Sequence, residues 1–566
     1  MSQAVGRMAG VAAVMAVVAD EGGAGRLRPL TADGRPAGPV EHAANLAAVV
    51  AERERRDAPR WLWASTATAY PPLVRANVRV ERCHDLELTE ALLLGYAGRW
   101  GEPRSLAAAS ARLTGSPVPA DPPPQPAVPP GDGQATLFET APAQSTGTDA
   151  LRALCRVYAD QIARIAATEH PGRFRLLAAA ESAGALLAVE MSAVGLPWRA
   201  DVHDALLVEL LGEPSPVGGP PRRLAELAAR IAHALGVRQL HPDSPTEVRR
   251  AFARVGIHLP NTRAWVLRDI DHPAVPLLLR YKELYRIWTA HGWAWRDAWV
   301  RDGRLRPEYV PAGVVSGRWA TRGGAALQIP KVIRRAVVAD PGWRLVVADA
   351  GQLEPRVLAA VSGDARLAAA AASGDLYAAL ARDAFDGDRA RAKLALLGAM
   401  YGQTGGAAVA ALAALRRGYP TALRYLEEAA RTGEAGGLVR SWLGRTCPPP
   451  SVSLGDVDDV EATADSGGRR ARARGRFTRN FVIQATAAEW ALTLLAMLRT
   501  ALVGTRAQLV FFQHDEVLVH CPAEETETAV RLIHEAAERA TGLLFGDTPV
   551  RFPLAVSVVD CYADAD

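Results

Sequence analysis

The sequence WRLVVADAGQLEPRVLAAVSGD, Trp343–Asp364, predicts a strand that ends on an acid and turns directly into a helix. Leu345–Val347 is an apolar, β-branched run typical of a strand, and Asp349 stands where that run ends. Beyond it, apolar residues recur at helical spacing, with Pro355 near the helix start, where a missing N–H costs little. A lone Asp at such a junction can simply cap the helix, but the junction is also a place to hold a metal.

A second acid lies far along the chain in LVFFQHDEVLVH, Leu509–His520, which predicts an apolar hairpin interrupted at its middle. His514, Asp515 and Glu516 are expected in the tight turn, because burying unpaired charge is expensive. Asp349 and Asp515 are thus two strand-borne carboxylates that could meet. Such a pair suggests a two-metal site for phosphoryl transfer, with cations about 4 Å apart.

A third stretch, DRARAKLALLGAMYG at Asp388–Gly402, predicts a helix with one functional face. Arg389, Lys393, Leu397 and Tyr401 are each four residues apart and therefore form one stripe along the helix. Two cations at this spacing repel each other unless an anion lies between them, and a triphosphate would supply that anion. The alternative is a solvated basic face.

Together these stretches resemble family A DNA polymerases, the group of bacterial DNA polymerase I. ADAGQLEPRVLAAVSGD resembles the family's motif A, RARAKLALLGAMYG its motif B on the fingers helix, and QHDEVLVH its motif C. Two further matches are SGRWATRGGAALQIP, Ser316–Pro330, and RFTRNFVIQATAAEW, Arg476–Trp490. The five blocks follow the family's order from about residue 185 to the C-terminus. The resemblance implies an α+β right-hand polymerase domain with palm, fingers and thumb.

The activity implied is a template-directed DNA polymerase that adds deoxynucleotides to a primer 3′-hydroxyl by two-metal nucleotidyl transfer. Asp349 and Asp515 would hold two Mg²⁺ ions, and Lys393 would be a third catalytic group, donating a proton to the leaving pyrophosphate. The resemblance also implies a nucleotide-binding set, a DNA-binding set and supporting residues. The nucleotide-binding set is Gln352, Glu354, Arg389, Lys393, Leu397 and Tyr401. The DNA-binding set is Arg318, Arg476, Asn480, Gln484 and His514, and the supporting residues are Arg356 and Glu516.

Individual roles follow from the same resemblance. Glu354 would block a ribose 2′-hydroxyl, and Tyr401 would pack against the nascent base pair. Arg318 would reach the minor groove at the primer end, where correct pairs present similar acceptors; alternatively, it simply holds its turn. Leu397 departs from the family, which has an aromatic residue there against the incoming sugar and base. We therefore expect weaker nucleotide affinity and altered fidelity with activity retained.

Residues 1–114 alternate short predicted strands with helical stretches, which is typical of an α/β domain. The expected strands are Val11–Val18, Arg60–Ala64 and Val78–Val80, and the expected helices are Glu41–Arg55 and Leu86–Ala97. By position in the family this is a ribonuclease H-like 3′–5′ exonuclease domain, which needs a carboxylate cluster. Asp20 and Glu21 are adjacent and so point to opposite faces of a strand, while Asp85 could match the family's second acid. A remnant with weak or absent proofreading is expected, and an active exonuclease is the alternative.

Residues 115–149 are rich in Pro, Gly and Thr and predict a disordered insertion. Within it, QATLF resembles the short peptide by which bacterial proteins dock on the replication sliding clamp, with Gln134, Leu137 and Phe138 entering the partner's pocket. A chance match of five residues is the alternative.

The rest of the chain divides by the same resemblance, with two predicted helices at Leu151–Ala179 and Ala185–Val194. The expected parts are 150–184 as the helical end of the exonuclease-like domain, 185–310 as thumb, 311–385 as palm, 386–480 as fingers with an acidic loop at 448–468, and 481–566 as the second part of the palm.

Composition limits the remaining possibilities. The 566 residues are 49% apolar, enough for several cores, and the net charge of +4 is too small to diagnose nucleic-acid binding by itself. Five scattered cysteines form no CxxC pair, and no run reaches the roughly 18 apolar residues of a membrane span. We expect a cytoplasmic monomer, acting on primer-template DNA and deoxynucleoside triphosphates in repair or gap filling, without membrane contact. A catalytically retired DNA-binding platform is the alternative from a different class.

Overall fold

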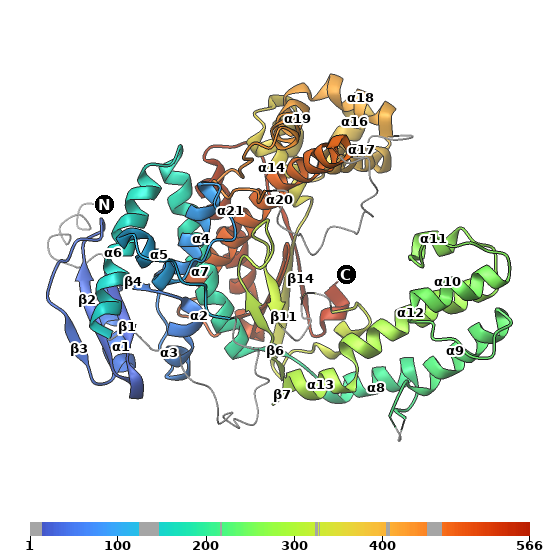
Figure 1. Cartoon of the computed structure of the whole chain (residues 1–566), viewed down its shortest axis with the longest axis horizontal. Coiled ribbons are helices and arrows are strands. Elements are labelled where there is room, and N and C mark those ends of the chain that lie inside the picture. The colour runs from blue at the N-terminus through green and yellow to red at the C-terminus, as the bar shows by residue number, and fades with distance from the viewer. Residues whose placement is uncertain are drawn as a thin grey trace.

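The computed structural model describes residues 14–123, 147–215, 218–322, 327, 329–402, 408–449 and 467–565. The predicted clamp peptide, with Gln134, Leu137 and Phe138, lies outside the described residues, as does most of the predicted acidic loop at 448–468. Within the described ranges, an α/β part, a helical arm and a sheet-based body capped by helices are visible (Figure 1).

The N-terminal part contains a five-stranded sheet in the order β3-β2-β1-β4-β5. The pairs β1–β4 and β4–β5 are parallel, and the pairs β1–β2 and β2–β3 are antiparallel. Its strands are β1 Val14–Ala19, β2 Gly25–Leu30, β3 Glu41–Ala43, β4 Arg60–Trp63 and β5 Arg82–Asp85. Its helices are α1 Leu46–Asp57, α2 Thr66–Ala69, α3 Pro71–Arg75, α4 Leu86–Tyr96, α5 Leu106–Thr114, α6 Gly147–Ala166 and α7 Pro171–Val194. The α/β character predicted for this part is confirmed.

Two local predictions in this part are wrong. Val78–Val80 is a loop with both valines buried, in which the Val80 N–H donates to the Tyr70 hydroxyl at 3.3 Å; the strand is β5, a few residues later. The predicted helix Glu41–Arg55 begins with strand β3 and becomes helical only at Leu46, because Asn45 caps α1 by accepting from the Ala48 N–H. In both places a tertiary or capping contact overrides the apolar pattern.

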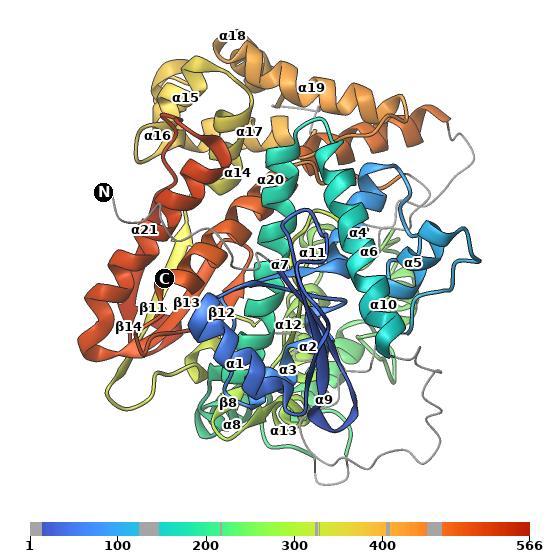
Figure 2. The same ribbon diagram turned by 90° about the vertical axis from the view of Figure 1, so that its left-hand side faces the viewer.

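Helix α7 is continuous, so the predicted interruption between Ala179 and Ala185 is wrong, and the predicted boundary at 184/185 falls inside this helix. The predicted helix Leu151–Ala179 is instead divided between Ala166, where α6 ends, and Pro171, where α7 begins. The small residues of α7 mark close packing: a methyl group on Gly184 would lie 2.5 Å from Leu492 Cδ1. Leu186 packs in the core of the N-terminal sheet, whereas Leu187 packs in the core of the main body. Helix α7 therefore lies between the two parts (Figure 2).

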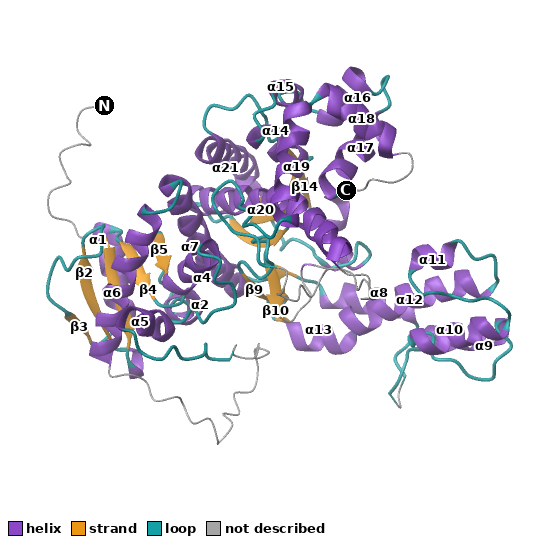
Figure 3. Ribbon diagram, turned by 45° about the horizontal axis from the view of Figure 1, so that its top comes forward, coloured by secondary structure: helices purple, strands orange, loops and turns teal. Residues whose placement is uncertain are grey.

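The arm predicted as the thumb is mainly helical (Figure 3). It contains β6 Leu196–Pro197, α8 Ala200–Leu211, α9 Arg222–Ala234, α10 Pro245–Arg254, α11 Ala264–Arg268, α12 Ala274–His291, α13 Trp293–Trp299, β7 Val300–Arg301 and β8 Arg304–Leu305. The three short strands pair in the order β6-β8-β7 at the base of the arm.

The body is a four-stranded antiparallel sheet in the order β12-β13-β11-β14. Its strands are β11 Trp343–Ala350, β12 Gln508–Gln513, β13 Glu516–Pro522 and β14 Leu554–Val559, and β9 Glu308–Val310 pairs with β10 Ala320–Arg322 nearby. Strand β11 is buried on both faces, because Val346 and Ala348 join the main core while Leu345 and Val347 join the core of the arm's base. The strand predicted at the start of Trp343–Asp364 is confirmed.

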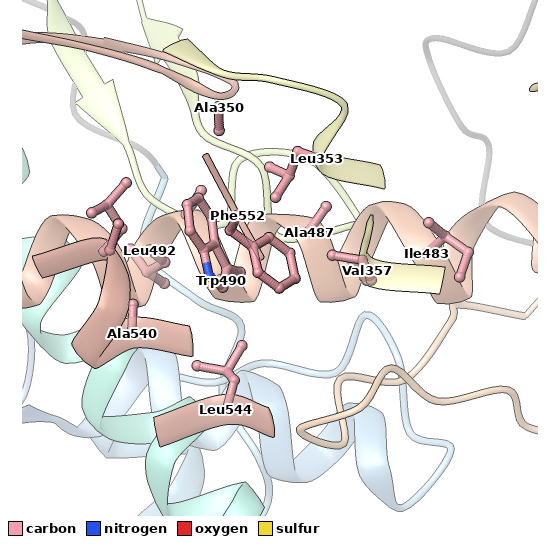
Figure 4. Packing of buried hydrophobic residues seen from close by; sticks show 14 of the residues in the cluster. Ala350, Leu353, Val357, Ile483, Ala487, Trp490, Leu492, Ala540, Leu544 and Phe552 are labelled. Carbon is pink, nitrogen blue, oxygen red and sulfur yellow. The ribbon is translucent and has the colours of Figure 1, made fainter. Parts of the chain in front are cut away.

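One face of this sheet is covered by α14 Leu353–Val361, α20 Gly467–Ala501 and α21 Thr526–Phe545. Trp490 of α20 stacks on Phe552 with ring centroids 5.2 Å apart, and Leu353 and Val357 of α14 lie beside the same helix (Figure 4). This packing fixes the position of α14, and hence of the residues that follow β11. Short 3₁₀ helices occur at Glu21–Gly23, Ile333–Ala336, Ala523–Glu525 and Tyr562–Ala565.

The region predicted as fingers holds α17 Arg389–Tyr401, α18 Ala408–Gly418 and α19 Pro420–Glu434, above the sheet in Figure 1. Helices α15 Ala365–Ala371 and α16 Leu376–Ala384, assigned by sequence to the palm, precede them, and α16 packs with α17 and α18. Helix α20 runs from this region into the body, so the predicted boundary at 480/481 falls inside a continuous helix.

Two helices are long and apolar enough to cross a membrane by length and composition alone: α7 and the Arg470–Ala501 stretch of α20. Of their most apolar windows, 67% and 78% respectively is buried inside the protein, and core helices pass the same test.

Candidate active site

The two predicted acids lie together at one edge of the body's sheet. Asp349, near the end of β11, is opposite Glu516 of β13, and the Ala350 N–H donates to the Asp515 carbonyl at 3.1 Å. Burial raises the pKa of Asp349, and the negative charge of Asp515 raises it further; burial also raises the pKa of Asp515. The ionised form of each carboxylate is disfavoured here, and a bound cation would favour it.

The hairpin turn differs slightly from the prediction. His514 and Asp515 form the turn, with His514 in the left-handed region at φ 59°, but Glu516 is already the first residue of β13. Its carboxylate accepts a hydrogen bond from the buried Tyr562 hydroxyl and lies 3.8 Å from Arg334 Nη1. Glu516 is therefore held by the sheet's own surroundings, as suits a supporting residue.

A cavity of about 250 Å³ opens beside Asp515 and collects residues from five separate segments. Its lining is Arg318, Gln352, Leu353, Glu354, Pro355, Leu397, Tyr401, Ala487, Ala488, His514 and Asp515. The structure thus brings together most of the nucleotide-binding set with two members of the DNA-binding set and one of the acids.

Glu354 is the central charge in the wall of this cavity. Its carboxylate accepts from Arg318 Nη2 at 2.7 Å and from the Tyr401 hydroxyl at 2.7 Å. The Glu354 side chain is only 13% exposed, and burial together with its charge raises the pKa of Tyr401. Three predicted site residues from different segments therefore hold one another in place by charge-assisted hydrogen bonds.

The predicted stripe on α17 is confirmed as one helix face. Asp388 caps the helix by accepting from the Arg391 N–H at 2.9 Å, and Gly402 ends it in the left-handed region at φ 70°. Lys393 is exposed, while Leu397 and Tyr401 reach the cavity. The cationic end of the stripe is thus open to solvent and its apolar end lines the pocket.

Asp375 and Tyr377, at the start of α16, are site neighbours that the sequence reasoning missed. Asp375 accepts from Arg389 Nε at 2.8 Å and from Gln352 Nε2 at 2.8 Å. Although burial opposes it, these hydrogen bonds lower the pKa of Asp375 to about 2. The Arg389 guanidinium also lies 5.7 Å from the Tyr377 ring. The available signal was the cap-forming Asp of SGDLYAAL, which sequence alone assigns to capping.

Gln352 and Arg356 shape the turn between β11 and α14. Gln352 is left-handed at φ 60°, and its amide oxygen accepts from the Leu376 N–H at 2.9 Å. Arg356 is fully buried and donates to backbone carbonyls, including those of Arg551 at 2.7 Å and Gly374 at 2.6 Å. The supporting role predicted for Arg356 fits these contacts, whereas Gln352 is committed to the turn as well as to the cavity wall.

The remaining predicted DNA-binding residues follow one line on α20. Arg476, Asn480 and Gln484 are spaced four residues apart, and the next position, Ala488, lines the cavity. Arg476 is exposed and packs beside Gly402, and the other two are partly buried. The line therefore leads from the cavity to the surface above α17.

The acids of the N-terminal part do not gather. Asp85 is 2% exposed and uses both carboxylate oxygens as a cap, accepting from the Leu88 N–H at 2.9 Å and the Thr66 N–H at 2.7 Å. Asp20 accepts from Arg26 Nε at 2.9 Å, two strands away from β5. In the described part of the chain, no group of three or more His, Cys, Asp or Glu residues is arranged to hold a metal.

Comparisons with known proteins find matches over much of the chain. The family model described as "DNA polymerase family A" matches residues 221–560. DNA polymerase I of Chloroflexus aurantiacus is 31% identical over 303 residues, which is 48% of this chain and 31% of that protein. The thermostable DNA polymerase I of Thermus aquaticus is 29% identical over 327 residues, 53% of this chain and 37% of that protein. The match thus spans about a third of these relatives.

A solved structure shares the fold over nearly the whole chain. The polymerase domain of Pol1 from M. smegmatis, in a complex with DNA primer-template and dNTP, superposes with a TM-score of 0.70. The match covers 97% of this chain and 95% of that chain at 18% sequence identity.

Proposed function

Because the chain belongs to DNA polymerase family A, we propose that it is a template-directed DNA polymerase that adds deoxynucleotides to the 3′-hydroxyl of a primer. The observation that carries the proposal is the meeting of Asp349 and Asp515 beside the cavity that Glu354 and Tyr401 enclose. A pair of acids next to a walled pocket, with exposed cations on the adjoining helix, has the layout that nucleotidyl transfer requires.

Family A polymerases use divalent metal ions, and the donor set here fits Mg²⁺. Mg²⁺ takes hard oxygen ligands and commonly uses one or two carboxylates, completing its shell with water and substrate phosphates. Asp349 and Asp515 would hold the ions, which when bound lower the pKa of the attacking hydroxyl and offset charge on the phosphates. The raised pKa values of both acids mean that ion binding competes with protons at mildly acidic pH.

The open end of the α17 stripe would bind the triphosphate. Arg389 and Lys393 lie on that exposed face, and Arg389 would exchange its Asp375 partner for phosphate. An ion pair between exposed side chains is worth only about 0.2–1 kcal/mol, so a more highly charged ligand can displace it. Lys393 would then donate a proton to the departing pyrophosphate.

The cavity would select the sugar and the base pair. Glu354, fixed by Arg318 and Tyr401, would leave no room for a ribose 2′-hydroxyl. Arg318 would sense the minor groove of the terminal primer pair, where all correct pairs present acceptors at similar positions. Leu397 offers the incoming base less planar contact than an aromatic residue would, in keeping with the expected low nucleotide affinity.

The line on α20 and the hairpin turn would guide the DNA. Arg476, Asn480 and Gln484 would follow the template strand toward the cavity, and His514 would contact the primer terminus. Their spacing along one helix face supports this assignment.

The N-terminal part would be a ribonuclease H-like remnant with weak or absent proofreading. Its mixed α/β sheet supports the fold assignment, and the commitment of Asp85 to two backbone N–H groups supports the loss of nuclease chemistry. Such an enzyme would suit gap filling or repair synthesis. The QATLF segment remains a proposed contact for the sliding clamp.

Primer extension tests the proposal. A labelled primer on a template would be incubated with Mg²⁺, with and without the four deoxynucleotides, beside Asp515→Asn, Asp349→Asn and the matched control Asp560→Asn. Asp560 is a carboxylate next to the same sheet whose exposed side chain pairs with Arg344 outside the cavity. We expect extension to vanish in the first two variants and persist in the control.

Anisotropy with the same labelled DNA separates the alternatives. Extension that survives Asp515→Asn would contradict the assigned site. A parent protein that binds primer-template but never extends it would instead be a retired platform. Shortening of the primer without nucleotides would reveal an active exonuclease.

A further inference from the structure

Arg318 projects from a tight turn whose backbone is held by hydrogen bonds within the turn. The Gly317 N–H donates to the Val314 carbonyl at 2.8 Å, and the Val314 N–H donates to the Arg318 carbonyl at 3.1 Å. Gly317 is left-handed at φ 86°, a conformation that other residues rarely adopt. The direction of the Arg318 side chain therefore depends on whatever supports Gly317.

That support is the guanidinium of Arg445. A methyl group on Gly317 would lie 2.5 Å from Nε, 2.6 Å from Cζ and 2.9 Å from Nη2 of Arg445, so the two residues touch without spare room. Arg445 is 6% exposed, and its guanidinium donates to Glu181 of α7, which is 1% exposed. The Arg445 N–H also donates to the Ser441 hydroxyl at 2.9 Å. The guanidinium beneath the turn is held by a buried ion pair.

A second buried carboxylate completes the arrangement. Glu489 of α20 accepts from the Ser441 hydroxyl and from the Leu443 N–H at 3.1 Å. Burial raises the pKa of Glu489 to about 7, with Arg445 opposing this and Glu181 adding to it. Arg445 thus forms an ion pair with Glu181 of α7 and interacts by charge with Glu489 of α20, and both acids are buried.

Helix α7 also supports the other neighbour of Arg318. Trp319 is buried, and a methyl group on Gly184 would lie 3.4 Å from its Cζ2 atom. Glu181 and Gly184 are three residues apart, on the same face of α7. One face of α7 therefore packs against Trp319 directly and supports Gly317 through Arg445.

We propose that Arg445, held by Glu181, is a positioning residue for Arg318, and that α7 thereby sets how strictly the polymerase requires a correctly paired primer end. The inference rests on the proposed contact of Arg318 with the minor groove. A hydrogen bond weakens steeply when its geometry is lost, so a turn that shifts on its support loses discrimination before it loses the ability to bind DNA.

The test measures sensitivity to a single acceptor atom. Single-turnover incorporation efficiency is compared on a primer ending in guanine and on one ending in 3-deazaguanine, which lacks the minor-groove N3 acceptor. The variants are Arg318→Met, Arg445→Met, the double variant Glu181→Gln/Arg445→Met and the control Arg440→Met. The double variant leaves no lone buried carboxylate at position 181 and so protects folding, which thermal melting verifies.

Arg440 is a matched control in the same loop. It also contacts the N-terminal part, donating to the Tyr96 carbonyl at 3.1 Å with its guanidinium 4.1 Å from the Tyr96 ring, but no contact with Gly317 is found for it among the described residues. We expect the parent and Arg440→Met to lose about 10-fold or more in efficiency without the acceptor, as for a hydrogen bond from a charged donor. Both Arg445 variants should lose less than about threefold, like Arg318→Met.

The outcomes separate the inference from its premise. If Arg318→Met keeps the parent's sensitivity, the proposed minor-groove contact itself is wrong. If Arg318→Met loses it but the double variant keeps it, Arg445 does not position Arg318. Equal loss in Arg440→Met would also overturn the inference, because any contact with the N-terminal part would then suffice.

Discussion

Replacing Glu489 by Gln should remove a pH dependence of stability that the buried Glu181–Arg445–Glu489 arrangement creates. Glu489 is 1% exposed, and burial raises its pKa from 4.5 to about 7. The folded protein thus holds this proton more tightly than the unfolded chain does. The stabilisation is complete below pH 4.5 and is lost as the pH rises to about 7. At about 1.4 kcal/mol per pH unit, the loss is about 3 kcal/mol.

Urea unfolding followed by tryptophan fluorescence at pH 5 and pH 8 measures this loss. Between the two values the parent should lose about 2.5 kcal/mol more unfolding free energy than Glu489→Gln does, because at pH 5 part of the pH range in which the stabilisation is lost has already been crossed. Glu489→Gln should lose much less, because Gln carries no proton to release and Arg445 then serves Glu181 alone. A control is Glu90→Gln: Glu90 is equally buried, but Arg164 and its other hydrogen-bond donors outweigh burial and lower its pKa. The same pH-dependent loss in the parent and in Glu489→Gln would refute the reasoning.

Three further outcomes are expected, two in the candidate active site and one in the N-terminal part. Tyr401→Phe removes the hydroxyl that donates to Glu354 at 2.7 Å and should cost about 1 kcal/mol of stability; the ratio of kcat/KM for deoxynucleotides over ribonucleotides should fall, and an unchanged ratio would argue against Glu354 as the sugar selector. Leu397→Phe should lower the nucleotide KM by adding planar contact with the incoming base. Steady-state kinetics would measure this, and an unchanged KM would contradict it. Asp85→Asn should lower the free energy of unfolding by about 1–2 kcal/mol through a weakened cap while primer extension continues; a lost primer-shortening activity would instead identify a working nuclease.

The local elements around the site could be predicted from sequence because their signals are local. Each element is indicated by residues close together in the chain. They are β11, from the apolar run before Asp349; the β12–β13 hairpin, from its interruption at His514 and Asp515; and α17, from its four-residue spacing. Chain-wide boundaries were harder. The apolar pattern predicts separate helices at 151–179 and 185–194, yet α7 continues through Gly184, which allows it to pack closely against Leu492.

The contacts between segments could not be read from the sequence. Asp375 has the pattern of a helix cap and does cap α16, but its ion pair with Arg389 depends on how α16 packs beside α17. Arg445 belongs to no sequence motif, and its proposed role follows from its contacts with Glu181 and Gly317, which lie more than a hundred residues away in the chain. Charge spacing predicts which groups a site holds, whereas tertiary packing decides which groups restrain them.

Helix α7 also bears on how this chain can be shortened, in the laboratory or in evolution. Its Leu186 is part of the N-terminal core and its Leu187 is part of the body's core, so a cut at residue 184 would strip a buried helix and expose both. A fragment carrying the polymerase half would have to begin before Pro171 and mask the face that the N-terminal sheet now covers. Removal of the N-terminal part alone would thus expose the apolar face of α7 and destabilise the body, which favours keeping that part whatever its chemistry.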